Sequence, residues 1–247
     1  MSAVAPPQAP NRLGLHQPGI AEVSRARHTV AMLGGRFSLE LGIDVDLDER
    51  EVDRWALGAA LVEDPSPTSL GIHTYRVLGK AGVSTLEDVR GCDREELGRL
   101  LGECGYAPYV ERTRSRLLAL ADGVAERYAG RLTTLGEEVA RPRELERSLG
   151  SLPGWDAQTV ATFLRELRGV WPGAKPALDV RVARAARHVA LPPTLRGLSD
   201  VASAAHLDLR DLEVGLVRLW AAHDLNRCPG GEECPLAALD REHLVHF

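Results

Sequence analysis

The stretch GSLPGWDAQTVATFLRELRGVWPGAKPALDVRVAR, residues 150–184, decides the fold. Three leucines with helical spacing stand at or before its Leu-Pro-Gly turn: Leu145, Leu149 and Leu152. Apolar residues with the same spacing follow the turn: Val160, Phe163, Leu164 and Leu167. The pattern therefore predicts two helices joined by a tight turn, a helical hairpin near residues 143–168.

A hairpin of this kind can bind an anion. The first backbone N–H groups of its second helix have no partner within the helix, and the helix dipole adds positive potential at that end. A DNA phosphate fits such a site, and phosphate contacts give affinity without reading sequence. An ordinary αα-hairpin with a purely structural role fits the same pattern and remains an alternative.

Basic residues gather beside this hairpin, although the 247-residue chain has a net charge of -5. Between residues 157 and 196 only two acidic residues occur, Glu166 and Asp179. The basic residues of the same segment number seven: Arg165, Arg168, Lys175, Arg181, Arg184, Arg187 and Arg196. This local excess of positive charge indicates a nucleic-acid surface, or else a set of solvated helix faces.

Bulk composition limits the remaining possibilities. At 44 % hydrophobic residues the chain can bury a core in one large domain or two lobes. No run approaches the roughly 18 to 20 apolar residues of a membrane span, so we expect no membrane partner. Residues 1–30 have no apolar signal core and predict a Pro-rich disordered tail. Four cysteines do not resemble a secreted disulfide framework, and we expect a reduced, cytoplasmic monomer.

Helical patterns dominate from residue 51 onward. The segment EVDRWALGAALV, residues 51–62, carries an apolar stripe with helical spacing, and short connections separate the helical segments that follow. Apolar and polar residues alternate only over residues 36–49, a pattern that fits a short strand or an extended segment. The expected fold class is all-α.

Three motifs in order, LPGWDAQTVATFL, WP and ALDVRVAR, resemble the helix-hairpin-helix base-excision DNA glycosylases, the endonuclease III-like superfamily. In that family a Leu-Pro-Gly-x-Gly hairpin precedes a helix, and Trp-Pro is soon followed by Val-Asp-Thr-His. The resemblance covers residues 51–189. It implies a two-lobed helix-hairpin-helix DNA glycosylase fold. A six-helix lobe would span 49–172, and the second lobe would combine 31–48 with 173–247.

The resemblance also implies which residues meet DNA. The first hairpin glycine is present as Gly154, whereas Asp156 replaces the second. A carboxylate at that position can cap the helix and would then compete with the phosphate. The implied DNA-binding residues are Gly154, Trp155, Asp156, Ala157, Arg181 and Arg184.

Two further positions carry the implied chemistry. The lysine that forms a Schiff base in bifunctional relatives falls at Gln158, which has no amine and cannot form an imine. Asp179 matches the catalytic aspartate, which would stabilise the oxocarbenium-like sugar and activate water. Asp179 also stands where an N-cap of the following helix belongs, so capping is the alternative role.

Base flipping is intrinsic to this chemistry, since the glycosidic bond is not accessible within the base stack. Where relatives have a polar gap-filling segment, this chain has VEDPSP, and its Glu63 and Asp64 would face phosphates unfavourably. The candidates for pocket or wedge residues are His73, Tyr106, Tyr109 and Trp155, each of which fits core packing equally well.

Many relatives hold a [4Fe–4S] cluster with four cysteines after the last helix. Here only Cys228 and Cys234 lie in that region, while Cys92 and Cys104 belong to the other lobe. Two thiolates cannot complete a four-ligand site, and neither His223 nor His243 matches a strong zinc spacing. The sequence prediction is no metal and no cofactor.

The function expected from the resemblance is base-excision repair of double-stranded DNA by a monofunctional glycosylase. Such an enzyme hydrolyses the N-glycosidic bond of a damaged or mispaired base. A non-catalytic helix-hairpin-helix DNA-binding protein is the alternative, favoured by Asp156 and Gln158. A protein-interaction scaffold without a DNA role would suit the acidic total charge.

Overall fold

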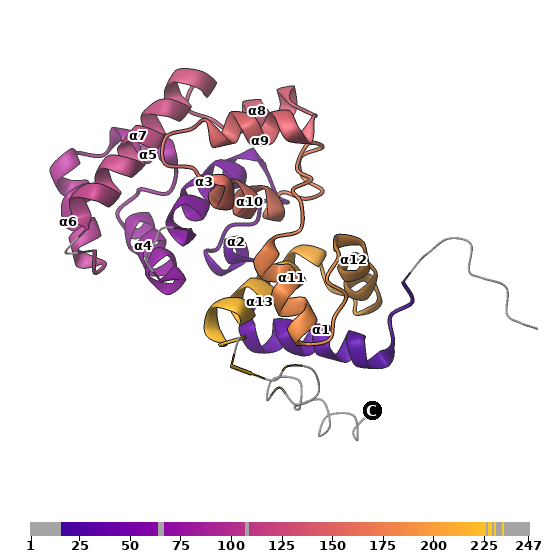
Figure 1. The fold of residues 1–247 in the computed structure, drawn as a ribbon. Coiled ribbons are helices and arrows are strands. Elements are labelled where there is room, and N and C mark those ends of the chain that lie inside the picture. Colours follow the sequence, from indigo (N-terminus) through magenta and orange to yellow (C-terminus); the bar gives the residue numbers. More distant parts are fainter. Residues whose placement is uncertain are drawn as a thin grey trace, which may run out of the picture. The chain divides into compact units, whose positions relative to one another are not determined.

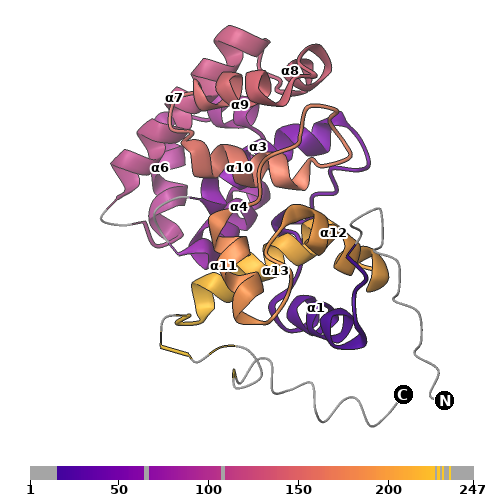
Figure 2. The same ribbon diagram turned by 45° about the vertical axis from the view of Figure 1, so that its right-hand side comes forward.

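The computed structural model describes residues 16–63, 67–106, 109–225, 227, 228, 230 and 234. These residues form thirteen α-helices and no β-strand, which confirms the all-α class. The helices divide into two compact units (Figures 1 and 2). Unit 1 comprises Met1–Gly34 and Val180–Phe247, and unit 2 comprises Gly35–Asp179. Within the described residues, no helix is long and apolar enough to cross a membrane.

Unit 1 is built from one N-terminal helix and three C-terminal helices. They are α1 (Ile20–Leu33), α11 (Val180–His188), α12 (Leu195–Ala204) and α13 (Leu209–Ala222). In both ribbon views the indigo α1 lies beside the orange and yellow helices, because it packs against α12 and α13 while α11 packs against α13. Segments from opposite ends of the chain therefore share one core.

Helix α1 corrects the prediction of a disordered tail over residues 1–30. Residues 20–30 are helical, and residues 1–15 lie outside the described part. The carboxylate of Glu22 accepts a hydrogen bond from the backbone N–H of Gly19 at 2.9 Å, next to the first turn of the helix. Ala26 and Thr29 are buried against the rest of unit 1.

Unit 2 contains nine helices in its described residues. They are α2 (Phe37–Glu40), α3 (Glu49–Val62), α4 (Thr68–Lys80), α5 (Leu86–Gly91), α6 (Arg94–Glu103), α7 (Val110–Tyr128), α8 (Thr133–Glu138), α9 (Pro142–Gly150) and α10 (Ala157–Glu166). Helix α3 lies at the centre and contacts α2, α4, α5, α8 and α10. Eight of these helices, rather than the expected six, fall within 49–172, and two of the eight, α5 and α8, are short helices of six residues each.

The boundaries between the units differ from the expected lobes. Residues 35–48 and 173–179 belong to unit 2, not to the terminal unit. A buried carboxylate explains the first difference: Glu166, at the end of α10, accepts hydrogen bonds from the backbone N–H groups of Phe37 and Ser38, both at 2.9 Å. These bonds fix the four-residue helix α2, where we expected a strand or an extended segment, to the hairpin. Burial raises the pKa of Glu166, and the hydrogen bonds from Ser38 act in the opposite direction.

The crossing of α3 and α4 depends on a glycine. A Cβ atom at Gly71 would lie 2.2 Å from the carbonyl oxygen of Leu61, whereas a Cβ at Gly79 on the same helix would meet no atom within 4 Å. We expect Gly71→Ala to lower the free energy of unfolding by about 1–3 kcal/mol, because the backbones must separate. Gly79→Ala should instead raise it by about 0.5–1 kcal/mol through helix propensity.

Urea titrations of the two alanine variants, followed by circular dichroism, test the crossing directly. Equal midpoints for Gly71→Ala and Gly79→Ala would contradict the close approach of α3 and α4.

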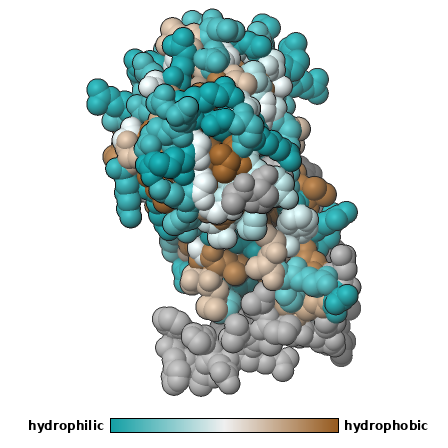
Figure 3. Space-filling view, turned by 90° about the vertical axis from the view of Figure 1, so that its left-hand side faces the viewer, coloured by the Kyte–Doolittle hydropathy of each residue, from teal (hydrophilic) through white to brown (hydrophobic). Residues whose placement is uncertain are grey.

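The face of unit 2 drawn in Figure 3 is mainly hydrophilic. Helix α6 contributes ion pairs at helical spacing: Arg99 contacts the carboxylates of Glu96 and Glu103. Exposed pairs of this kind contribute little to stability, because water and salt screen them. This surface therefore keeps α6 solvated rather than holding the unit together.

Candidate functional site

The predicted hairpin is present, formed by α9, a turn over residues 151–156, and α10. The backbone N–H of Trp155 donates to the carbonyl of Leu152 at 3.2 Å and closes the turn. Gly154 has a φ of +75°, and a Cβ at this position would lie 2.6 Å from Cγ of Arg116. Both the left-handed backbone and the close approach require glycine here.

Asp156 is the N-cap of α10. Its Oδ1 accepts hydrogen bonds from the backbone N–H of Thr159 at 2.8 Å and from the Thr159 hydroxyl at 2.9 Å. The prediction that this carboxylate caps the helix is therefore confirmed. One N–H group that a phosphate would otherwise use has a protein partner, and a negative charge lies at the helix N-terminus.

Of the four candidate wedge residues, two are buried and two are exposed. Trp155 and Tyr106 are buried, and the Trp155 ring packs against Phe163 with ring centroids 5.0 Å apart. His73 and Tyr109 are exposed. In this conformation only the exposed pair is accessible to a DNA base.

A polar cluster lies on one side of α10, where Gln158, Thr162 and Arg165 follow each other at helical spacing. Gln158 Nε2 donates to Asp179 Oδ2 at 3.0 Å. Arg165 donates from the same nitrogen, Nη2, to Asp179 Oδ2 at 3.3 Å and to the Thr162 hydroxyl at 2.9 Å. Thr162 in turn donates to Glu63 Oε1 at 2.6 Å. These five residues, Glu63, Gln158, Thr162, Arg165 and Asp179, are called the α10 cluster below.

Burial makes the charges of the α10 cluster significant. The side chains of Arg165 and Asp179 are only 2 % and 4 % exposed. Charges in such surroundings interact more strongly than charges in water, and each needs its partner to offset the cost of desolvation. The arrangement holds one carboxylate, that of Asp179, in a fixed orientation beside a guanidinium and an amide.

The structure thus brings together two residues that the sequence singled out, Asp179 and Gln158. Glu63 joins them through Thr162, and its predicted neighbour Asp64 lies outside the described residues. Sequence reasoning missed Thr162 and counted Arg165 only as part of the local positive charge. Their spacing from Gln158, at i+4 and i+7, was the available signal.

The remaining predicted DNA-binding residues lie in the other unit. Arg181 and Arg184 are on α11 of unit 1. The Arg181 guanidinium lies 5.9 Å from the centroid of the Trp220 ring, a cation–π contact, and Arg184 is exposed.

A pocket of about 540 Å³ opens in unit 2 away from the α10 cluster. Its lining combines Trp171 and other apolar residues with four carboxylates, from Asp46, Asp48, Glu49 and Glu137. Negative lining disfavours a DNA phosphate.

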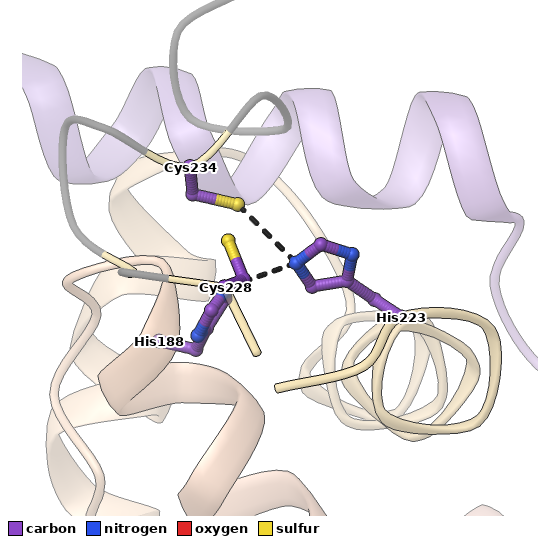
Figure 4. Close-up of side chains that lie close together, drawn as sticks. All are labelled: His188, His223, Cys228 and Cys234. Atoms are coloured by element: carbon purple, nitrogen blue, oxygen red, sulfur yellow. Dashed lines mark hydrogen bonds between the residues drawn. The ribbon is translucent and has the colours of Figure 1, made fainter. Parts of the chain in front are cut away.

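Four potential metal ligands converge in unit 1 (Figure 4): His188, His223, Cys228 and Cys234. Their ligand atoms all lie within 4.8 Å of one another. Nε2 of His223 lies 3.1 Å from Nε2 of His188 and 3.6 Å from Sγ of Cys234. Burial, with a smaller contribution from His223, lowers the pKa of His188.

This group of four ligands was not expected from the sequence, which predicted no metal site at the two cysteines. Cys228 and Cys234 are free thiols rather than a disulfide. His223 does lie beside them, as considered from the sequence, whereas His243 is outside the described residues. The sequence did not indicate His188 as a ligand, because it lies far from the other three residues in the chain. The packing of α11 on α13 brings it to them.

No protein-family model matches the chain, and no curated protein shows significant similarity to it.

Proposed function

We propose that this protein is a monofunctional DNA glycosylase with a two-lobed helix-hairpin-helix glycosylase fold. The supporting observation is the contact between Gln158 and Asp179, at 3.0 Å, beside the second helix of the hairpin. In the resembled family these two positions carry the lyase lysine and the catalytic aspartate. Their proximity is what a shared reaction centre requires, since both must reach the same sugar carbon.

Asp179 would supply the chemistry. As the base departs, positive charge develops on the sugar, and a nearby carboxylate stabilises it or takes a proton from the attacking water. Gln158 and Arg165 both donate to Oδ2 of this carboxylate and so fix its orientation. Pre-organised groups of this kind contribute to catalysis because they need not reorient during the reaction.

Gln158 limits the proposed reaction to base release, without a lyase step. An amide nitrogen cannot form the imine with the sugar that a lyase step needs. The product is therefore an intact strand with an abasic site. The substrate is double-stranded DNA with one nucleotide flipped out of the stack, held through the hairpin backbone.

The alternative is a helix-hairpin-helix protein that binds DNA without chemistry. The low exposure of the Asp179 side chain and its ion pair with Arg165 favour this reading, because an engaged carboxylate is less available to a sugar. The two readings share the DNA contacts and differ only in base release.

The deciding experiment is base release from duplexes that carry oxidised, alkylated, deaminated or mismatched bases. Strand breaks that need hot alkali would support the monofunctional enzyme, while breaks without alkali would contradict the absence of a lyase step. No release on any duplex, with salt-sensitive DNA binding retained, would favour the non-catalytic protein.

The capping carboxylate of the hairpin gives a separate test of DNA binding. Asp156→Asn keeps an N-cap but removes one negative charge from the proposed phosphate site. We expect duplex affinity to rise about five-fold at low salt, which corresponds to about 1 kcal/mol for two close charges in water. Fluorescence anisotropy measures the effect.

Asp93→Asn is the matched control, because Asp93 caps α6 in the same unit through the N–H groups of Glu95 and Glu96. The affinity of Asp93→Asn for the duplex should equal that of the wild type. If Asp156→Asn also binds as the wild type does, the N-terminus of α10 is not the phosphate site.

A further inference from the structure

The spacing of the four ligand atoms in unit 1 matches a single tetrahedral ion. Zinc bonds of about 2.0–2.1 Å to nitrogen and about 2.3 Å to sulfur place neighbouring ligand atoms about 3.3–3.8 Å apart. The separations of 3.1 Å between the two imidazole nitrogens and 3.6 Å from Cys234 Sγ to His223 Nε2 lie close to this range. Small side-chain adjustments suffice to complete the coordination, since all four atoms lie within 4.8 Å of one another.

We propose that His188, His223, Cys228 and Cys234 bind one zinc ion in a structural site. Two imidazoles and two thiolates form one of the common ligand sets of structural zinc, whereas calcium and magnesium prefer oxygen. A two-iron cluster with the same residues would keep the histidine pair and the cysteine pair on different irons. The short distance between Cys234 and His223 instead fits one shared ion.

The positions of the two histidines favour a cation. His188 is the last residue of α11, and His223 directly follows α13. The C-terminal end of a helix carries partial negative charge, so both helices direct it toward the site. The two imidazoles also face each other through Nε2, and an ion between them lets both nitrogens act as lone-pair donors with the protons on Nδ1.

Two of the four ligands are buried, and the other two, His223 and Cys228, are partly exposed. Cys234 has no exposed surface and His188 is 9 % exposed. Gly230, between the two cysteines, has a φ of +78°, and a Cβ there would lie 3.2 Å from Nδ1 of His188. Glycine therefore allows the backbone to approach the imidazole. Four protein ligands leave no position for substrate, so the ion would tie the chain after α13 to the end of α11.

Metal content of the purified full-length chain tests the site independently of any DNA activity. We expect about one zinc per chain after dialysis, and a cobalt-substituted protein with the absorption bands of tetrahedral thiolate coordination. Cys234→Ser and His223→Asn should lose the zinc. Cys92→Ser and His73→Asn, which lie in unit 2 away from the cluster, should retain it.

If the ligand variants fail to fold, the proposal is tested on the wild-type protein by its zinc content and its thermal stability. Removal of zinc with a chelator should lower the Tm, and zinc alone should restore it, because an ion that binds only the folded state stabilises that state. The proposal is overturned if the wild type neither contains zinc nor takes it up, if Cys228 and Cys234 are found joined in a disulfide, or if the ligand variants hold as much zinc as the controls.

Discussion

The Asp179→Asn variant is expected to release bases about 10²- to 10⁴-fold more slowly than the wild type, the range that one positioned acid–base group contributes. The change is nearly isosteric, so the donors Gln158 and Arg165 keep an oxygen to contact. In the proposed reaction, the substitution removes the negative charge that would stabilise the sugar and the base that would receive the proton of water. Single-turnover rates on the best duplex substrate measure the effect.

Asp122→Asn is the control for this prediction. Asp122 lies on α7 of the same unit and pairs with Arg90 at the surface, with both side chains 60 % exposed. Its rate should be unchanged. Equal rates for Asp179→Asn and the wild type would remove Asp179 from the reaction. Circular dichroism and duplex binding must remain intact in both variants, so that a loss of rate reports chemistry rather than folding.

Glu166→Ala is expected to lower the free energy of unfolding by about 2–6 kcal/mol, at about 1–3 kcal/mol for each buried donor that loses its partner. The carboxylate is fully buried and accepts the backbone N–H groups of Phe37 and Ser38. Its removal leaves two buried donors without that partner and a cavity at the end of α10. Helix α2 should detach from the hairpin. Urea denaturation gives the free energy, and hydrogen exchange at Phe37 and Ser38 locates the loss.

Glu126→Ala, at an exposed position of α7, should change stability little and serves as the control. Comparable destabilisation by the two alanine substitutions would contradict a specific role for the buried carboxylate.

The pKa of Glu166 adds a pH dependence. Because burial raises its pKa in the folded state above 4.5, the charged form is disfavoured by folding. The stabilising contribution is therefore complete below about pH 4.5 and falls as pH rises through the folded-state pKa. Relative to Glu166→Gln, which does not titrate, the wild type should lose stability as the pH rises above about 4.5.

The hairpin could be predicted from sequence because its evidence is local. The leucine spacing before the turn, the glycine at 154 and the cap at Asp156 each specify one feature of α9 and α10. Helix α1 was missed because its buried positions are the small residues Ala26 and Thr29. Their hydrophobic contrast with the exposed face is weak, and the helix depends on packing against α12 and α13.

Sites assembled from distant segments were less accessible to sequence reasoning. The pairing of Asp179 with Gln158 could be expected only through the family resemblance. The contribution of Glu63 required the packing of α3 against α10. The approach of His188 to His223 required the packing of α11 against α13, which no local pattern encodes.

The division of unit 1 between the two ends of the chain has a consequence for synthesis on the ribosome. Helix α1 emerges before unit 2, but its packing partners α12 and α13 emerge only after all of Gly35–Asp179. Unit 2 is continuous and can fold as soon as its own residues leave the exit tunnel. The nascent chain therefore carries α1 without its partners until α12 and α13 have been synthesised, so unit 2 can fold before unit 1 although unit 1 begins first.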